Sequence, residues 1–281
     1  WQGAGAVYYI KGSLALSDLS WIWQQPWTTK EERGFDDGYC KHASMEAGGR
    51  SFYFCTNVIR GALTPGSSEI SVLATPGNEG HFVTSGTTYG DLLVWSELRK
   101  GSPGGRIRGW SPDGRGVRTL HANVPVDTCD VGISTTHVAG FSTANSCASY
   151  QPEGRLWIAE RKPDGMLGEI RLGPVFWPEP VVGSPVKTWG DFAAAVWVER
   201  KYERLDDRRR LLLARTTDWA MRDLRGPEGH EIGDAGLTDD HLYVVYVEAG
   251  SRRFSHIHRY DLDHFDAIGH PLTPTDASAV P

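Results

Sequence analysis

The sequence predicts an all-β protein, a β-propeller built from four-stranded antiparallel blades. The first observation is a repeat, because "GDLLVWSEL" at 90–98 is followed further along the chain by the similar "GDFAAAVWVER" at 190–200. The second is that the sequence lacks long amphipathic helical patterns. The third is its content of 33 glycines and 16 prolines, which suits many tight turns. Short strands that recur with a period of roughly 40 to 50 residues are typical of propeller blades.

The region from 79 to 126 shows the repeating unit most completely. Apolar and aromatic runs at 81–89, 91–98, 106–110 and 116–124 each predict a strand. The turn sequences "SPGG" and "SPDG" separate the last three runs. We therefore expect four consecutive antiparallel strands in this unit.

The same order of strands and turns can be followed along the rest of the chain. This predicts one domain over 1–281 with six blades; five or seven blades are alternatives, because the first and fourth units are indistinct. The first unit lacks a first strand, and the tail "TDASAVP" is expected to supply it and close the ring. The predicted units are Trp1 to Phe35, Asp36 to Asn78, Glu79 to Val126, Asp127 to Val182, Gly183 to Gly226 and Pro227 to Pro281.

Length, hydrophobicity and charge narrow the range of partners. The chain has 281 residues, of which 40% are hydrophobic, so it can bury a large core. No run approaches the ~18 consecutive apolar residues of a membrane span, and membrane insertion is not expected. The formal net charge of -6 opposes the positive field that nucleic acid requires. The chain begins at Trp1 with no leader pattern ahead of it, which we interpret as a processed or trimmed form.

The four cysteines predict two disulfides. There is no C-x-x-C pair, which disfavours a zinc ribbon or a redox motif, although a thiol pair for metal or redox work is the alternative. Four cysteines allow three connectivities. The strand map favours Cys40 with Cys55 and Cys129 with Cys147, each bridge clipping an inner hairpin. Such bridges would place the protein in an extracellular or periplasmic compartment.

The predicted first strands, which would line the central channel, each begin near a basic or imidazole group. If these groups converge, they predict a ligand site at the channel mouth that takes an anion or a divalent metal. His42, His81 and His137 are the expected metal ligands, and no cofactor is otherwise required. The alternative is that histidines occupy a polar channel without any ligand. The predicted ligand-binding set is His42, His81, His137, Lys187 and His230.

Two further groups are candidates for binding. Trp177 lies between predicted strands in "PVFWPEPV" and precedes a proline, so it is expected on the surface, where it could form a platform for a sugar. His256 and His258 lie on one face of a predicted strand, with His264 nearby. These histidines form either a metal-chelating pair or a polar outer face.

Carboxylates could perform acid and base catalysis, but no spacing singles out a pair. Asp36, Asp37, Asp191 and Glu231 lie near first strands or their connections, and the three aspartates lie beside glycine, where turns favour Asp. The G-x-S-x-G, phosphate-binding glycine loop and H-E-x-x-H motifs are absent from the sequence.

The phrases "GDLLVWSE", "RYDLDHFD" and "WSPDGRG" resemble the blade repeat of TolB-like six-bladed propellers. In that repeat a glycine-acid pair precedes an apolar run that ends in Trp, and a later strand ends in Tyr-Asp-Leu. The resemblance covers about four of the six units. It implies the fold, because such propellers include protein-binding scaffolds as well as domains of peptidases and polysaccharide lyases. The resemblance assigns no catalytic residue to this chain, because no catalytic motif of those families is matched.

These observations lead to two expectations of function. The first is a secreted or periplasmic binding module that recognises a protein or a glycan at one face of the ring. The alternative is a glycan-active hydrolase or lyase with its site at the channel mouth, with or without a metal. A convergent set of acids with a metal would favour the enzyme, and an exposed aromatic patch would favour binding.

Overall fold

The structure is a computed structural model, and it confirms the all-β prediction. It describes residues 25–28, 40–44, 50–55, 57–64, 69, 71–101, 103–143, 154–175, 179–180, 186–201, 204–249 and 254–268. Strands and tight turns dominate these ranges, which also contain the short 3-10 helices η2 (Pro76–Glu79) and η3 (Leu262–Ala267). In this part of the chain no helix is long and apolar enough to cross a bilayer.

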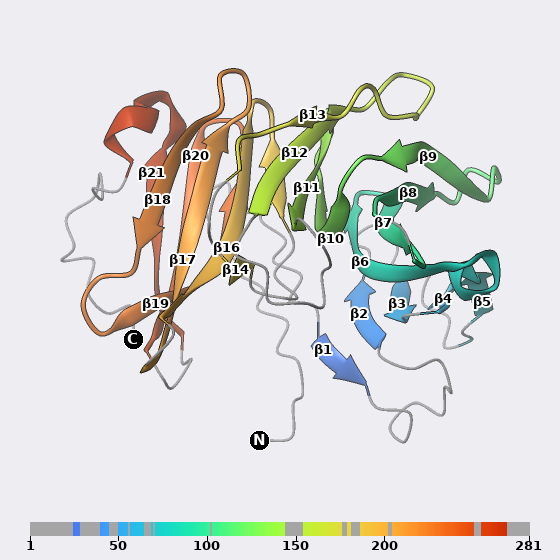
Figure 1. The fold of residues 1–281 in the computed structure, drawn as a ribbon, viewed down its shortest axis with the longest axis horizontal. Coiled ribbons are helices and arrows are strands. Elements are labelled where there is room, and N and C mark those ends of the chain that lie inside the picture. The colour runs from blue at the N-terminus through green and yellow to red at the C-terminus, as the bar shows by residue number, and fades with distance from the viewer. Residues whose placement is uncertain are drawn as a thin grey trace.

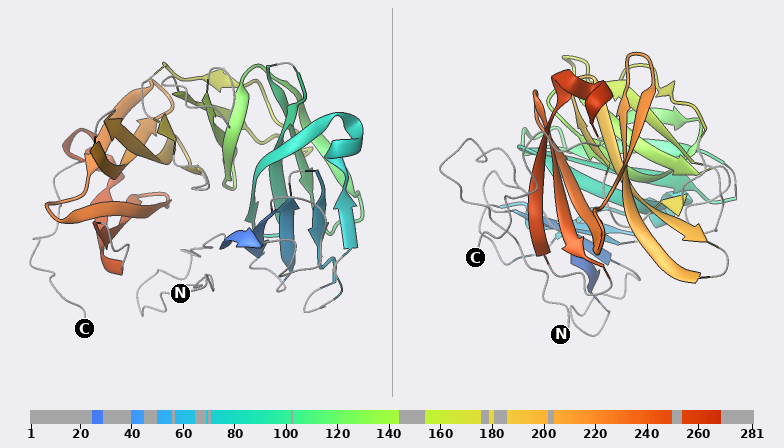
Figure 2. Two further views of the ribbon diagram at one scale, coloured as in Figure 1. Left: turned by 60° about the horizontal axis from the view of Figure 1, so that its bottom comes forward. Right: turned by 90° about the vertical axis from the view of Figure 1, so that its left-hand side faces the viewer.

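The strands within the described residues form five antiparallel sheets that follow one another in chain order around an arc (Figures 1 and 2). The first sheet contains β1 (Gln25–Thr28), β2 (Cys40–Ser44), β3 (Ser51–Cys55), β4 (Ile59–Gly61) and β5 (Ser71–Ala74). The second contains β6 (His81–Tyr89), β7 (Leu92–Arg99), β8 (Gly105–Trp110) and β9 (Val117–Val124). The third contains β10 (Asp127–Ile133), β11 (His137–Thr143), β12 (Gly154–Glu160) and β13 (Arg171–Leu172).

The last two sheets differ in size. The fourth contains β14 (Glu179–Pro180), β15 (Lys187–Trp189), β16 (Phe192–Lys201), β17 (Arg204–Arg215) and β18 (Ala220–Arg225), and both β14 and β15 pair with β16. The fifth contains β19 (His230–Leu237), β20 (His241–Glu248) and β21 (Phe254–Asp261).

The predicted unit 79–126 is confirmed as one four-stranded sheet with its strands in the expected order. The two predicted N-terminal units are corrected, because β1 pairs with β2 and the described residues of both units therefore lie in one sheet. A second correction concerns 127–143. The segment at 135–144 was predicted to be a first strand, but β10 precedes it and β11 is the second strand of its sheet. The tail 275–281, which was predicted to close the ring, lies outside the described residues.

The core lies between the sheets. Apolar clusters join the second sheet to the third around Val94 and Trp157, the third to the fourth around Phe141 and Ala195, and the fourth to the fifth around Leu213. Middle sheets therefore bury both faces, and β7 is buried almost along its whole length. First strands also contact each other, β6 with β10, β10 with β15 and β15 with β19. This packing brings equivalent hairpins of successive sheets to the same end of the strands, on one face of the arc.

Candidate functional site

Two hairpins between first and second strands share an aromatic-Gly-Asp ending. Tyr89 ends β6 and Trp189 ends β15, and each is followed by a two-residue turn. The first turn residues, Gly90 and Gly190, have φ of 53° and 50°. A positive φ at the first central position is what a type II′ hairpin turn requires, and glycine adopts it without strain. The repeated "GD" of the sequence is therefore a hairpin turn that presents the aromatic ring before it.

The corresponding hairpins of the third and fifth sheets end in histidine. In the β10–β11 turn the backbone N–H of His137 donates to Oγ of Ser134 at 3.1 Å. In the β19–β20 turn the backbone N–H of His241 donates to Oγ1 of Thr238 at 3.2 Å. In these two sheets a histidine therefore begins the second strand of the hairpin.

The ends of these hairpins meet across sheets that are not neighbours. The rings of Tyr89, from the second sheet, and Trp189, from the fourth, lie 5.8 Å apart at an interplanar angle of 63°. Nε1 of Trp189 donates a hydrogen bond to Asp239 of the fifth sheet. We call Tyr89, His137, Trp189, Asp191 and Asp239 the hairpin face. It joins residues from four sheets at the end of the strands where these hairpins lie.

The hairpin face carries exposed carboxylates around half-buried rings. Asp191, Asp239 and the adjacent Asp240 are exposed, whereas Tyr89 and Trp189 are partly buried. This combination offers aromatic surface together with hydrogen-bond acceptors of negative charge.

A cation and an imidazole lie at the β10–β11 hairpin of the third sheet. Nη1 of Arg161 donates to the carbonyl oxygens of Ser134 at 2.6 Å and Thr135 at 3.0 Å, which fixes this cation to the backbone of the hairpin. Burial, followed by the charge of Arg171, lowers the pKa of His137, and Asp191 opposes the shift. His137 is therefore mainly neutral at pH 7, able to accept or donate one proton.

The structure separates the histidines that were predicted to converge. His81 and His230 begin first strands, and Nδ1 of each lies near a backbone carbonyl, that of Glu79 at 2.9 Å and that of Glu228 at 3.0 Å. His137 instead begins β11, which runs antiparallel to the first strand β10. A nine-residue strand such as β6 spans roughly 26 Å, so His81 and His137 lie at opposite ends of the sheets. Among the described residues, no group of three or more His, Cys, Asp or Glu is placed to hold a metal ion.

The other predicted residues have different positions. Nζ of Lys187 lies 3.9 Å from Oδ2 of the buried Asp234, a contact between first strands of the fourth and fifth sheets. Residue His42 lies in β2, but its side chain is outside the described part, and Trp177 is outside it entirely. Sequence reasoning missed Asp234, although "CDVGI" and "GDAGL" place an aspartate at the same point of β10 and β19.

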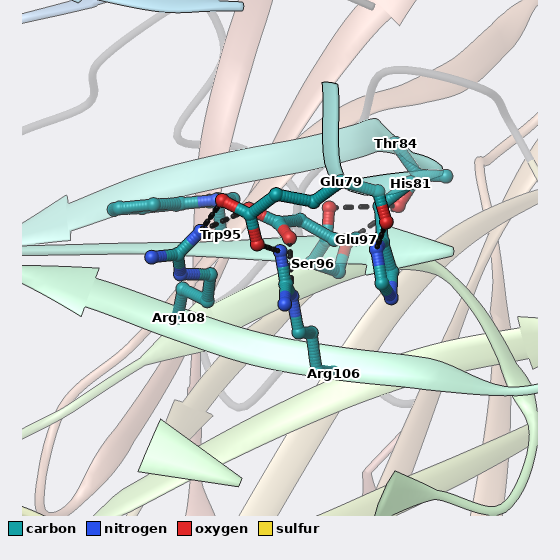
Figure 3. A network of polar contacts seen from close by, with 8 residues as sticks. All are labelled: Glu79, His81, Thr84, Trp95, Ser96, Glu97, Arg106 and Arg108. Carbon is teal, nitrogen blue, oxygen red and sulfur yellow. Dashed lines mark hydrogen bonds and ion pairs between the residues drawn. The ribbon is translucent and has the colours of Figure 1, made fainter. Parts of the chain in front are cut away.

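A polar network lies near His81, at the end opposite the hairpin face (Figure 3). The carboxylate of Glu97 is fully buried and accepts hydrogen bonds from Nε1 of Trp95 at 2.6 Å and Nε of Arg106 at 2.5 Å. The exposed Glu79 binds Arg106 and Arg108 from the solvent side. Its ion pair with Arg106 lowers the pKa of Glu79. Because both carboxylates have hydrogen-bonding or ion-pair partners within the protein, we interpret this network as structural. It links β7, β8 and η2.

Cys55 and Cys129 each take part in a disulfide. Cys55 lies directly opposite Cys40 in the β2–β3 ladder. Facing residues of an antiparallel pair have Cα atoms about 4.5 to 5.5 Å apart, within the range that a disulfide spans. The register is thus compatible with the predicted pairing of Cys40 with Cys55. Cys147 is outside the described residues, and both pairings stay predictions.

A second titratable group, the histidine stack, lies on the fifth sheet. It consists of His230, His256 and His258, whose successive rings are 5.1 and 4.6 Å apart. Tyr246 contacts both His256 and His258, and its hydroxyl lies 2.8 Å from that of Tyr260. Burial raises the pKa of both tyrosines, so they stay neutral near pH 7. Burial, followed by neighbouring imidazoles, lowers the pKa of His256 and His258.

The histidine stack is expected to make the fold less stable in mild acid. A lowered pKa means that the folded chain binds fewer protons than the unfolded one. The free energy of unfolding therefore keeps its full value above about pH 6.5 and declines as the pH falls below it. Solvent screening of these partly exposed rings keeps the loss below about 1 kcal/mol per histidine. Urea unfolding between pH 7.5 and 5.5 should show a decline that is smaller in His256→Gln and His258→Gln. The control His264→Gln, at an exposed site, should keep the full decline; equal slopes in all variants would contradict the assignment.

No protein-family model and no curated protein matches the chain in sequence. Solved structures similar to it include an apocarotenoid oxygenase from Synechocystis, at 12% identity and a TM-score of 0.42, covering 83% of this chain and 60% of that one. Tricorn protease is similar at 9% identity and a TM-score of 0.45, covering 84% and 29%. A prolyl endopeptidase is similar at 12% identity and a TM-score of 0.41, covering 78% and 32%. The chain spans less than two thirds of each of these proteins, and similarity at this level assigns neither family nor function.

Proposed function

We propose that the chain closes as a single six-bladed propeller of the TolB-like kind and acts as a binding module that recognises a protein or a glycan at the hairpin face. One observation carries the proposal. Tyr89, Trp189 and Asp239 contact one another in sequence on the same face of the arc, although they come from three different sheets. The proposed setting is extracellular or periplasmic, with two disulfides and no required cofactor.

The physical support is the combination of rigid aromatic rings and exposed polar groups. Aromatic rings supply large contact areas at low cost in side-chain entropy, and Trp and Tyr are enriched among the few residues that carry most of the binding energy of an interface. The type II′ turns hold Tyr89 and Trp189 at the ends of paired strands, so the rings are positioned before a ligand arrives. A site on rigid hairpins of several sheets suits recognition.

Replacing Trp189 by alanine is expected to weaken ligand binding at least tenfold, because the substitution removes one ring of the contacting pair and the donor to Asp239. The ligand would first be found by screening wild-type protein against arrays of glycans and peptides, and affinity then measured by calorimetry. The control is Val72→Ala, which truncates a residue that is 49% exposed in the first sheet. Equal affinity of wild type, Trp189→Ala and Val72→Ala would rule out the hairpin face as the site.

The second candidate is a glycan-active hydrolase or lyase, which the electrostatic interaction of Asp191 with His137 favours. A neutral imidazole beside a carboxylate can serve in general acid and base steps. Product analysis on neutral and acidic glycans separates the two functions, because turnover that His137→Gln abolishes would establish an enzyme. Binding without any product would favour the module.

A further inference from the structure

We infer that Ser255 is a nucleophile activated by His230, and that it forms a covalent acyl intermediate with an uncharged carboxylic ester. This site lies in the histidine stack of the fifth sheet, at the end of β19 opposite its hairpin, and it is independent of binding at the hairpin face. Two observations carry the inference, a chain of hydrogen bonds through the hydroxyl and a β-bulge that aims the hydroxyl into that chain.

The chain of hydrogen bonds fixes which nitrogen of His230 can act as a base. Nδ1 of His230 lies 3.0 Å from the carbonyl oxygen of Glu228, and Nε2 lies 3.0 Å from Oγ of Ser255. Because a carbonyl oxygen can only accept, Nδ1 of the neutral ring carries the hydrogen and Nε2 is the acceptor. The Ser255 hydroxyl therefore donates to Nε2 of His230. A hydroxyl bonded to an imidazole that a third group orients is the arrangement of an activated nucleophile.

A β-bulge in β21 aims the Ser255 hydroxyl into this chain. Consecutive residues of a regular strand point to opposite faces, yet Oγ of Ser255 lies 2.8 Å from Nδ1 of its neighbour His256. Phe254 and His256 face consecutive residues of β20, so Ser255 is the extra residue of the bulge. Bulges re-aim side chains and are common beside active sites. Since its own hydrogen is donated to His230, Oγ accepts from Nδ1 of His256, a contact that favours loss of the hydroxyl proton.

The reaction that this arrangement supports is acyl transfer to Ser255 followed by hydrolysis. Oγ of Ser255 forms a bond to the carbonyl carbon of the ester while its proton passes to Nε2 of His230. The bond from that carbon to the alcohol oxygen then breaks, and the alcohol leaves with the proton from His230. Water attacks the acyl group on Ser255 in the same way, which releases the carboxylic acid and restores the hydroxyl.

The surroundings of Ser255 favour an uncharged ester. The rings of Tyr246 and His258 lie next to that of His256. Burial raises the pKa of Tyr246 and lowers the pKa of His258, so both rings are mainly neutral at pH 7. Their faces offer apolar contact to an alkyl or aryl group. Ser255 and His230 are themselves partly exposed, which leaves the hydroxyl within reach of a small substrate.

Covalent labelling of the full chain tests the inference. The probe is a fluorophosphonate with an alkyl chain, whose phosphorus reacts with an activated serine, releases fluoride and leaves a stable adduct. We expect peptide mapping to place the adduct on Ser255, and Ser255→Ala to abolish it. His230→Gln should slow labelling about a hundredfold, the lower end of what a general base contributes. Hydrolysis of 4-nitrophenyl butyrate should fall in the same two variants.

The matched control is His264→Gln, which removes an exposed imidazole whose Nδ1 lies near Asp261, and this variant should be labelled as fast as wild type. A second comparison lies within the wild-type chain, where Oγ1 of Thr136 lies 2.9 Å from Nδ1 of His137. Folded wild-type protein that gains no adduct, or gains it at Thr136 or another hydroxyl, overturns the inference. So does a folded His230→Gln that is labelled at the wild-type rate. Either result leaves the proposed function at the hairpin face unchanged.

Discussion

Replacing Glu97 by alanine is expected to lower the free energy of unfolding by about 3 to 5 kcal/mol, the cost of breaking a buried ion pair from one side. The Glu97 side chain is 0% exposed and lies on β7, an inner strand of the second sheet. Its removal leaves the indole N–H of Trp95 and the guanidinium of Arg106 without their buried acceptor. Nη1 of Arg108, 3.7 Å from the same carboxylate, loses its buried counter-ion as well.

Glu79 provides the matched control for this prediction. It pairs with Arg106 and Arg108, as Glu97 does, but its side chain is 44% exposed. Water replaces an exposed carboxylate at little cost, so Glu79→Ala should lose less than about 1 kcal/mol. Chemical denaturation at pH 7 measures both variants. Similar losses at the two positions would show that burial does not decide the value of this network.

Most of the fold could be predicted because its strands pair with their neighbours in sequence. The second sheet follows directly from apolar runs separated by Gly-Pro turns, since hairpin pairing is a local property. The pairing of β1 with β2 was missed because the strands that flank 29–39 carry no pattern that specifies which sheet they join. The strand β10 was missed because it is buried on both faces, and its run "DTCDVGI" lacks the alternation that marks a half-buried strand.

The candidate site was only partly visible in the sequence. The Gly-Asp repeat was recognised, and it places Tyr89 and Trp189 at equivalent hairpins, but their contact depends on how separate sheets pack. Glu97 could have been found, because a lone acid inside the apolar run 92–98 needs a buried partner. Arg106, directly opposite across the "SPGG" hairpin, supplies it. The channel hypothesis failed for His137 because an error of one strand reverses the end of the sheet at which a residue lies.

Replacing Gly132 by alanine is expected to cost about 3 kcal/mol or more of stability, at the upper end of what overpacking a core costs. Gly132 lies on β10 where the third sheet meets the fourth. A Cβ atom built there would lie 1.7 Å from the carbonyl oxygen of Val186 and 3.2 Å from the backbone nitrogen of Lys187. Because both atoms belong to the backbone, no side-chain rotation can relieve the clash. The two sheets must therefore move apart.

The same displacement should reach the hairpin face, since Trp189 follows Val186 by three residues on β15. Gly132→Ala is thus expected to lower both the urea midpoint and the affinity for the ligand of that face, although Gly132 is not part of the face. The control is Gly168→Ala, where the nearest atom to a new Cβ is 3.5 Å away, an ordinary contact that should change stability by less than about 0.5 kcal/mol. If the two alanine variants unfold at the same urea concentration, the third and fourth sheets are not in close backbone contact at Gly132. If Gly132→Ala is destabilised but binds with full affinity, the position of Trp189 does not depend on this contact between sheets.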